Sequence, residues 1–186
     1  MTYWRWTALL ALGVIAIMLG FGAIDGMKAC GGDDPIFVFE MVRSPADVDA
    51  LFQENCRSAL AAAQYKGLWL DIAAFIWIYS AFLICGILAL RQEAGAANSA
   101  LARLAIGLVV VAALADQFEN YMLLRILASL PGQQSDIDAL FLAPRIKFAV
   151  LGVITALAGW LHLQRAGWRK LVGAVAMFGG LWSAVG

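Results

Sequence analysis

Three polar residues at close spacing interrupt an otherwise apolar stretch of the chain. Asp116, Glu119 and Asn120 have i, i+3, i+4 spacing, which places all three on one face of an α-helix. A carboxylate near the centre of a membrane costs about 3 kcal/mol, so such groups usually face the interior of a helix bundle and have partners there. The spacing therefore predicts a polar site lined by one face of this helix.

Two other apolar stretches contribute further polar residues. Asp71 begins one stretch, and Phe75 and Tyr79 follow it at four-residue steps, which on an α-helix form one stripe. Lys147 begins the other stretch. We expect these residues to lie in the outer half of a bilayer, with Asp116 nearer its middle. The predicted ligand-binding site consists of Asp71, Tyr79, Asp116, Glu119, Asn120 and Lys147.

This set contains more acidic than basic side chains. Lys147 can neutralise one carboxylate, and it should pair with at least one because an isolated lysine is costly in hydrocarbon. The remaining negative charge favours a bound proton or a cationic ligand.

The composition is that of an integral membrane protein. Hydrophobic residues make up 63% of the chain and charged residues 14%, whereas soluble domains are about half apolar and about a quarter charged. Four apolar runs approach or exceed the length of about 18 residues that crosses the hydrocarbon core. They are residues 7–24, 67–90, 104–124 and 148–163. We expect an all-α, polytopic transmembrane helix bundle that forms a single transmembrane domain over residues 1–186.

A fifth apolar run, residues 171–186, is shorter and rich in glycine. It is compatible with a thin span, a re-entrant segment or a helix at the membrane interface, and we favour a span. The first run resembles the apolar part of a signal peptide, but no small-x-small cleavage site precedes Asp25, so we expect it to remain as a span.

Basic residues near the ends of the runs predict the orientation. Arg5, the segment 91–103, and the cluster of Arg165, Arg169 and Lys170 all fall on one side, which the positive-inside rule assigns to the cytoplasm. We therefore expect a multi-pass protein of a bacterial inner membrane, with a cytoplasmic N-terminus. The acid-rich loops, residues 25–66 and 129–138, then lie in the periplasm.

The long loop 25–66 carries signals of its own. Ser44, Pro45 and Asp47 read as the N-cap, the first residue and the third residue of a short helix that runs toward Phe52, with an extension beyond Cys56 left open. The preceding residues 35–42 are largely apolar, so we expect them to lie against the membrane surface or the mouth of the bundle.

The cysteines divide between two environments. Cys30 and Cys56 lie in the outer loop, where an oxidising compartment favours a disulfide between them; two unpaired thiols are the alternative. Cys85 lies within the second apolar run, where we expect a small buried apolar side chain.

The chain gives no sign of a metal or cofactor site. His162 is the only histidine, which argues against bis-histidine haem ligation and multi-histidine zinc sites, and we expect an interfacial side chain there. We expect no cofactor. The 13 basic and 13 acidic residues leave no net charge, so nucleic acid is not an expected partner.

The order of several short motifs resembles a known group of proteins. The motifs are Phe39-Glu40, Ser44-Pro45, Asp71 with Phe75 and Tyr79, Asp116 with Glu119-Asn120, and Lys147-Phe148. In this order the sequence resembles a group of small bacterial integral membrane proteins of about four spans, over most of the chain before Arg165. The resemblance implies the four-span fold but no established activity, and the fifth run departs from its usual pattern.

Three functions remain open from the sequence. The first is a site that binds or transports a small cation, a proton or an amphiphile with a cationic head, in contact with membrane lipids. The second is a structural membrane subunit in which the polar residues only fix helix packing. The third is a membrane enzyme acting on a lipid or isoprenoid, with Glu119 or Asp116 as acid or base and Lys147 or Asn120 stabilising charge.

Overall fold

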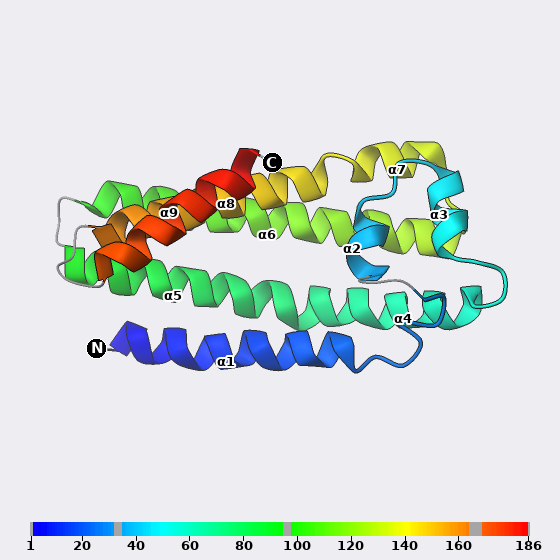
Figure 1. The fold of residues 1–186 in the computed structure, drawn as a ribbon, viewed down its shortest axis with the longest axis horizontal. Helices are drawn as coiled ribbons and strands as arrows, with labels where there is room; N and C mark the ends of the chain where they lie inside the picture. The colour runs from blue at the N-terminus through cyan, green and yellow to red at the C-terminus, as the bar shows by residue number, and fades with distance from the viewer. Residues whose placement is uncertain (1, 32–34, 95–97, 164–168, 186) are drawn as a thin grey trace. The chain divides into compact units, whose positions relative to one another are not determined.

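The computed structural model describes residues 2–31, 35–94, 98–163 and 169–185. Almost all of these residues are helical, and none of them belongs to a β-strand (Figure 1). Within them, four helices are long and apolar enough to cross a membrane. The expected all-α fold with four long candidate spans is therefore confirmed. Arg165, from the basic cluster used for the orientation, lies outside the described residues.

The first candidate span is α1, Thr2–Gly22, an apolar helix of 21 residues without a buried side chain. Large residues such as Leu12 and Leu19 are exposed on it. A helix that is apolar all round would be costly in water but is stable in lipid, where its length of about 31 Å matches the hydrocarbon core. The chain turns after α1 at Gly26, where φ is 87° and a side chain would meet the carbonyl of Ala59.

The second candidate span is one continuous helical rod. It comprises α4 (Arg57–Leu70), the π-helical turn η1 (Asp71–Phe75) and α5 (Ile76–Ala94). Its 37 residues from Arg57 to Glu93 correspond to about 56 Å, almost twice the thickness of a hydrocarbon core. The uncharged residues 72–90 alone are long enough to cross that core. Most of α4 therefore lies outside the membrane-crossing part of this rod.

The remaining long helices are α6 (Ser99–Ala128) and α8 (Ala143–Leu163). The 30 residues of α6 correspond to about 45 Å, so this helix also exceeds the membrane thickness. The short α7 (Gln134–Leu140) precedes α8.

The helices are organised in two compact units. We call Val14–Trp77 with Ala115–Arg145 the disulfide unit, and Met1–Gly13, Ile78–Leu114 and Ile146–Gly186 the α9 unit. Helices α1, α5, α6 and α8 contribute residues to both units. The expectation of a single domain stays a prediction.

In the α9 unit, α9 (Arg169–Val185) packs closely on α8 (Figure 1). A Cβ atom on Gly159 would overlap the backbone of Met177, and one on Gly180 would overlap the backbone of Gly152. Small residues permit such close contact between membrane helices. The fifth apolar run is therefore a helix packed on α8. Its 17 residues correspond to about 26 Å, somewhat less than the hydrocarbon core, so the full span stays a prediction.

In the disulfide unit, three short helices pack on the ends of two long ones. Helices α2 (Pro35–Glu40), α3 (Pro45–Leu51) and α7 join α4 and the last turns of α6 around an apolar core (Figure 1). We call this group the disulfide cap. Its core consists of Phe39, Val42, Val48, Phe52, Leu60, Leu68, Met122, Leu123, Ile126, Ile137 and Leu140. The surplus lengths of α4 and α6 therefore support a separate hydrophobic core.

The loop signals in the cap are largely confirmed. Ser44 Oγ accepts a hydrogen bond from Asp47 N at 3.2 Å, as expected for the N-cap of α3. The helix ends at Leu51, so the extension beyond Cys56 is wrong. In the apolar segment before it, Phe39 is fully buried in the cap core, while Phe37 and Val38 are exposed. Only one face of this segment therefore packs against the core of the disulfide cap.

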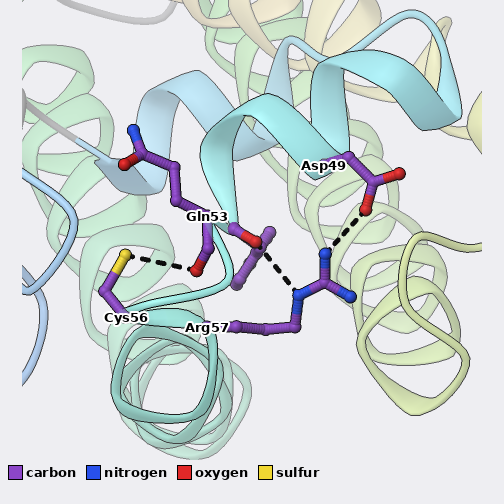
Figure 2. Close-up of polar contacts among 5 residues, drawn as sticks. Asp49, Gln53, Cys56 and Arg57 are labelled. Atoms are coloured by element: carbon purple, nitrogen blue, oxygen red, sulfur yellow. Dashed lines mark hydrogen bonds and ion pairs between the residues drawn. The ribbon is translucent and has the colours of Figure 1, made fainter.

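A disulfide joins Cys30 to Cys56, with a Cα–Cα distance of 5.3 Å, as expected. Cys56 Sγ lies 3.4 Å from the carbonyl oxygen of Gln53 (Figure 2). The disulfide sulfur carries no proton, so this is a close sulfur–oxygen contact and not a hydrogen bond. Cys85, which we expected to be a small buried apolar side chain, is partly buried.

Arg57 fixes the turn that follows α3. Its Nε donates to the carbonyl oxygen of Phe52 at 3.0 Å, and its Nη2 forms an ion pair with Asp49 at 2.9 Å (Figure 2). These contacts connect the end of α3 to the start of α4. The positive charge of Arg57 is therefore already paired with Asp49.

Candidate functional site

The turn at Asp71 departs from regular α-helix. The backbone N–H of Ile76 donates to the carbonyl oxygen of Asp71, an i to i+5 hydrogen bond that defines the π-helical turn η1. The indole Nε1 of Trp77 donates to the carbonyl oxygen of Ile72 at 2.9 Å and satisfies an acceptor in the same turn. Single π-turns within α-helices occur frequently at functional sites. Nothing in the sequence pattern indicates this turn.

Asp71 is connected to α6 by a side-chain hydrogen bond. Asn120 Nδ2 donates to Asp71 Oδ2 at 2.5 Å, between residues that are 49 positions apart in the sequence. A hydrogen bond to an ionised group is stronger than one between neutral groups. The structure therefore brings together two residues that the sequence placed in one site.

The polar face of α6 is buried along its length. Asp116, Glu119 and Asn120 are 4%, 1% and 2% exposed, so all three side chains face the interior. About 20 Å of helix axis separates Arg103 from Asp116, and the residues between them are uncharged. Asp116 thus lies toward the end of α6 that carries the disulfide cap, with Glu119 and Asn120 about one turn further along.

Asp71 and Phe75, two residues of the expected stripe with Tyr79, have different neighbours. Asp71 bonds to α6, whereas the ring of Phe75 packs edge-on against Phe21 of α1, with 5.7 Å between the ring centroids. The two side chains thus contact different neighbours within the disulfide unit, and Tyr79 belongs to the α9 unit. That the three residues form one stripe stays a prediction.

Lys147 and Tyr79 belong to the α9 unit. Both are buried, with 7% and 8% of their surface exposed, and Lys147 Nζ lies 5.0 Å from the centroid of the Phe148 ring. Burial of a lysine requires compensation by other groups. That both residues join the acidic residues in one ligand site stays a prediction.

Two polar contacts of buried side chains, Gln64 and Asp136, in the disulfide cap were not predicted from the sequence. Gln64, 1% exposed, donates from Nε2 to the carbonyl oxygen of Pro35 at 2.9 Å. Arg125 forms an ion pair with Asp136 at 3.0 Å. In the sequence, Gln64 was only a polar residue at a position where the helical period of α4 places core residues. Its hydrogen-bond partner is a backbone group 29 positions away, which no local pattern predicts.

The described residues contain no group of three or more His, Cys, Asp or Glu side chains that could hold a metal ion. His162, which we expected at the interface, is partly buried near Trp4, with 6.4 Å between the ring centroids.

Comparisons with protein-family models, with curated proteins and with solved structures give no match to this chain.

Proposed function

We propose that this integral membrane protein binds a small cation or a proton at the acidic residues of η1 and α6, on the side of the disulfide cap. The observation that carries the proposal is the hydrogen bond from Asn120 to Asp71 at the start of a π-helical turn, beside fully buried Glu119. An ionisable group that only connected two helices would not need this local distortion of the backbone.

The acidic residues give the site its chemistry. Asp71, Asp116 and Glu119 are carboxyl groups on two neighbouring helical segments of one compact unit. Carboxylate groups within transmembrane segments mark ion pathways and proton relays, because their charge is too costly to keep without a role or a partner. Oxygen ligands of this type suit hard cations and cationic head groups.

We further propose that Lys147 pairs with at least one of these carboxylates and that Tyr79 extends the site. In this arrangement Lys147 balances one carboxylate, and the ligand or proton balances another. The cap side faces the periplasm of a bacterial inner membrane, as supported by the disulfide, which persists in oxidising compartments. The group of small bacterial membrane proteins described above is the proposed family.

Equilibrium binding to the purified full-length protein in nanodiscs tests the proposal. The probes are NaCl, KCl and tetramethylammonium chloride, titrated by calorimetry at pH 5 and pH 8; the proton is followed by infrared absorption of protonated carboxyl groups over the same range. We expect Glu119→Gln to weaken cation binding at least about tenfold, or to remove a titrating carboxyl band, because one charged ligand is lost. Glu54→Gln is the matched control, since Glu54 is exposed on the disulfide cap.

A purely structural role has a specific observation in its favour, because the bond between Asn120 and Asp71 itself joins two helices. The double variant Glu119→Gln with Lys147→Met distinguishes the two roles. We expect it to fold and to lose binding. Wild-type protein that binds none of the three cations and shows no titrating carboxyl group would support helix packing alone and contradict the proposal.

A further inference from the structure

Two arginine side chains in the disulfide unit share one aromatic ring. Phe141 lies at the junction of α7 and α8, and the guanidinium carbon Cζ of Arg145 is 3.6 Å from the centroid of its ring. Cζ of Arg43, from the loop between α2 and α3, is 4.8 Å from the same centroid. Because both distances end at one point, the two guanidinium groups lie closer together than the Debye length of about 10 Å at 0.1 M salt.

Two like charges at this separation repel each other, and salt screens the repulsion only in part. Arg145 also lies in the first turn of α8, where the helix macrodipole disfavours a cation. Within the described residues, Arg57 and Arg125 each form an ion pair, whereas Arg43 and Arg145 form none. Stacking on Phe141 attracts each cation to the ring but does not neutralise either of them.

Asp47 and Asp138 each bond to other groups. Asp47 Oδ2 accepts the backbone N–H of Arg43 at 2.8 Å and not its guanidinium group. Asp138 Oδ1 accepts from Gln134 Nε2 at 2.8 Å. Asp47 therefore attracts Arg43 through space but leaves its guanidinium donors available.

The backbone around the pair is held in place. Gln134 Nε2 also donates to the carbonyl oxygen of Arg43 at 3.0 Å, so this residue is fixed through both its N–H and its carbonyl group. Arg145 Nη1 donates to the carbonyl oxygen of Phe141, which leaves its other N–H groups for a ligand. Planar guanidinium groups prepositioned in this way suit an anion with several acceptor oxygens.

We propose that Arg43 and Arg145 form a binding site for a phosphate group, with Phe141 as the platform that positions both side chains. The site lies at the start of α8, directly before the uncharged residues 148–163 of its apolar stretch. Lipid head groups occupy this level of a bilayer. Exposed Leu142 beside Phe141 provides an apolar surface next to the cations. The same chemistry would hold the phosphate of a phospholipid or free inorganic phosphate.

The test uses the purified full-length protein, and its two arms separate the two sources of phosphate. In the first arm, thermal unfolding is measured in dodecyl maltoside micelles, which contain no phosphate, with increasing phosphatidylglycerol. In the second arm, inorganic phosphate is added to the same micelles without lipid, with an equal ionic strength of NaCl as the reference. Stabilisation in the first arm alone identifies a lipid phosphate, and stabilisation in the second arm identifies free phosphate as a ligand.

Substitutions assign the effect to the two arginines. We expect Arg43→Gln and Arg145→Gln each to weaken the apparent affinity at least about tenfold, because a hydrogen bond to a charged group is lost. Arg57→Gln, which removes a cation already paired with Asp49, should leave it unchanged. Arg43 is exposed, so its variant retains the fold if that of Arg145 does not. Wild-type protein stabilised in neither arm, or an Arg43→Gln variant that keeps the wild-type affinity, would overturn the proposal.

Discussion

The side-chain amide of Asn120 donates a hydrogen bond to the carboxylate of Asp71 at 2.5 Å, joining α6 to the first residue of the π-helical turn. We expect Asn120→Ala to lower the free energy of unfolding by about 1.5–3 kcal/mol, the range for a hydrogen bond to a charged group. A double-mutant cycle with Asp71→Ala, measured by unfolding in denaturing detergent, isolates the pair. The exposed Asn55→Ala serves as control. A coupling energy of zero would show that the contact contributes nothing to stability.

The disulfide should contribute substantially to the stability of the cap. Cys30 and Cys56 are 26 residues apart, and closing a loop of this length in the unfolded chain is worth about 3–4 kcal/mol in the chain-entropy model. We expect reductant to lower the unfolding temperature and to expose both thiols to alkylation, while Cys85→Ser leaves the shift unchanged. Equal alkylation of Cys30 and Cys56 with and without reductant would rule out the bond.

The start of α3 should make the cap sensitive to acid. The backbone N–H of Arg43 and the hydroxyl of Ser44 bond to the Asp47 carboxylate and lower its pKa from the ordinary value of 3.8. A lowered folded-state pKa stabilises the protein above pH 3.8, and this contribution is lost as the pH falls below that value. Asp47→Asn should therefore flatten the pH dependence of unfolding between pH 5 and pH 2. A variant with the wild-type slope in this range would contradict the assignment.

The contact between α8 and α9 should not tolerate a side chain. A Cβ on Gly159 would overlap the backbone of Met177, so Gly159→Leu should cost about 1–3 kcal/mol through overpacking. Gly107→Leu is the matched control, since a Cβ there meets no atom within 4 Å. Thermal unfolding of the two variants in detergent gives the comparison. Equal unfolding temperatures would mean that α9 does not pack on α8 in solution.

The side of the membrane on which the C-terminus lies tests whether α9 spans the membrane. With a cytoplasmic N-terminus, a spanning α9 places the C-terminus outside. A reporter fused after Gly186 should then be active only in the periplasm. Activity confined to the cytoplasm would remove α9 from the set of spans.

Hydrophobic length alone predicted the four long spans, because a bilayer imposes a threshold that the runs around α1, α5, α6 and α8 meet or approach. Local side-chain rules also predicted the N-cap at Ser44, since its hydrogen bond reaches only to Asp47. The same spacing rules placed Asp116, Glu119 and Asn120 on one face, and all three are buried.

Contacts between residues far apart in the sequence could not be predicted from hydrophobic length or local spacing. The bond from Gln64 to Pro35 and the shared ring of Arg43 and Arg145 depend on how the short cap helices pack, which no period in the sequence encodes. The π-turn at Asp71 has no residue signature in the sequence. Excess helix length in α4 and α6 was the one overlooked signal that a cap core exists beyond the spans.

The central claim is that the acidic residues of α6 are accessible from the cap side. A membrane-impermeant methanethiosulfonate reagent tests it on Glu119→Cys in a Cys85→Ala background, with vesicles of either orientation. We expect labelling only from the side of the disulfide cap. Gln53→Cys, exposed on the cap, sets the maximal rate, and Ala105→Cys, fully buried, sets the minimum. A folded Glu119→Cys variant that labels no faster than Ala105→Cys from either side would contradict the claim.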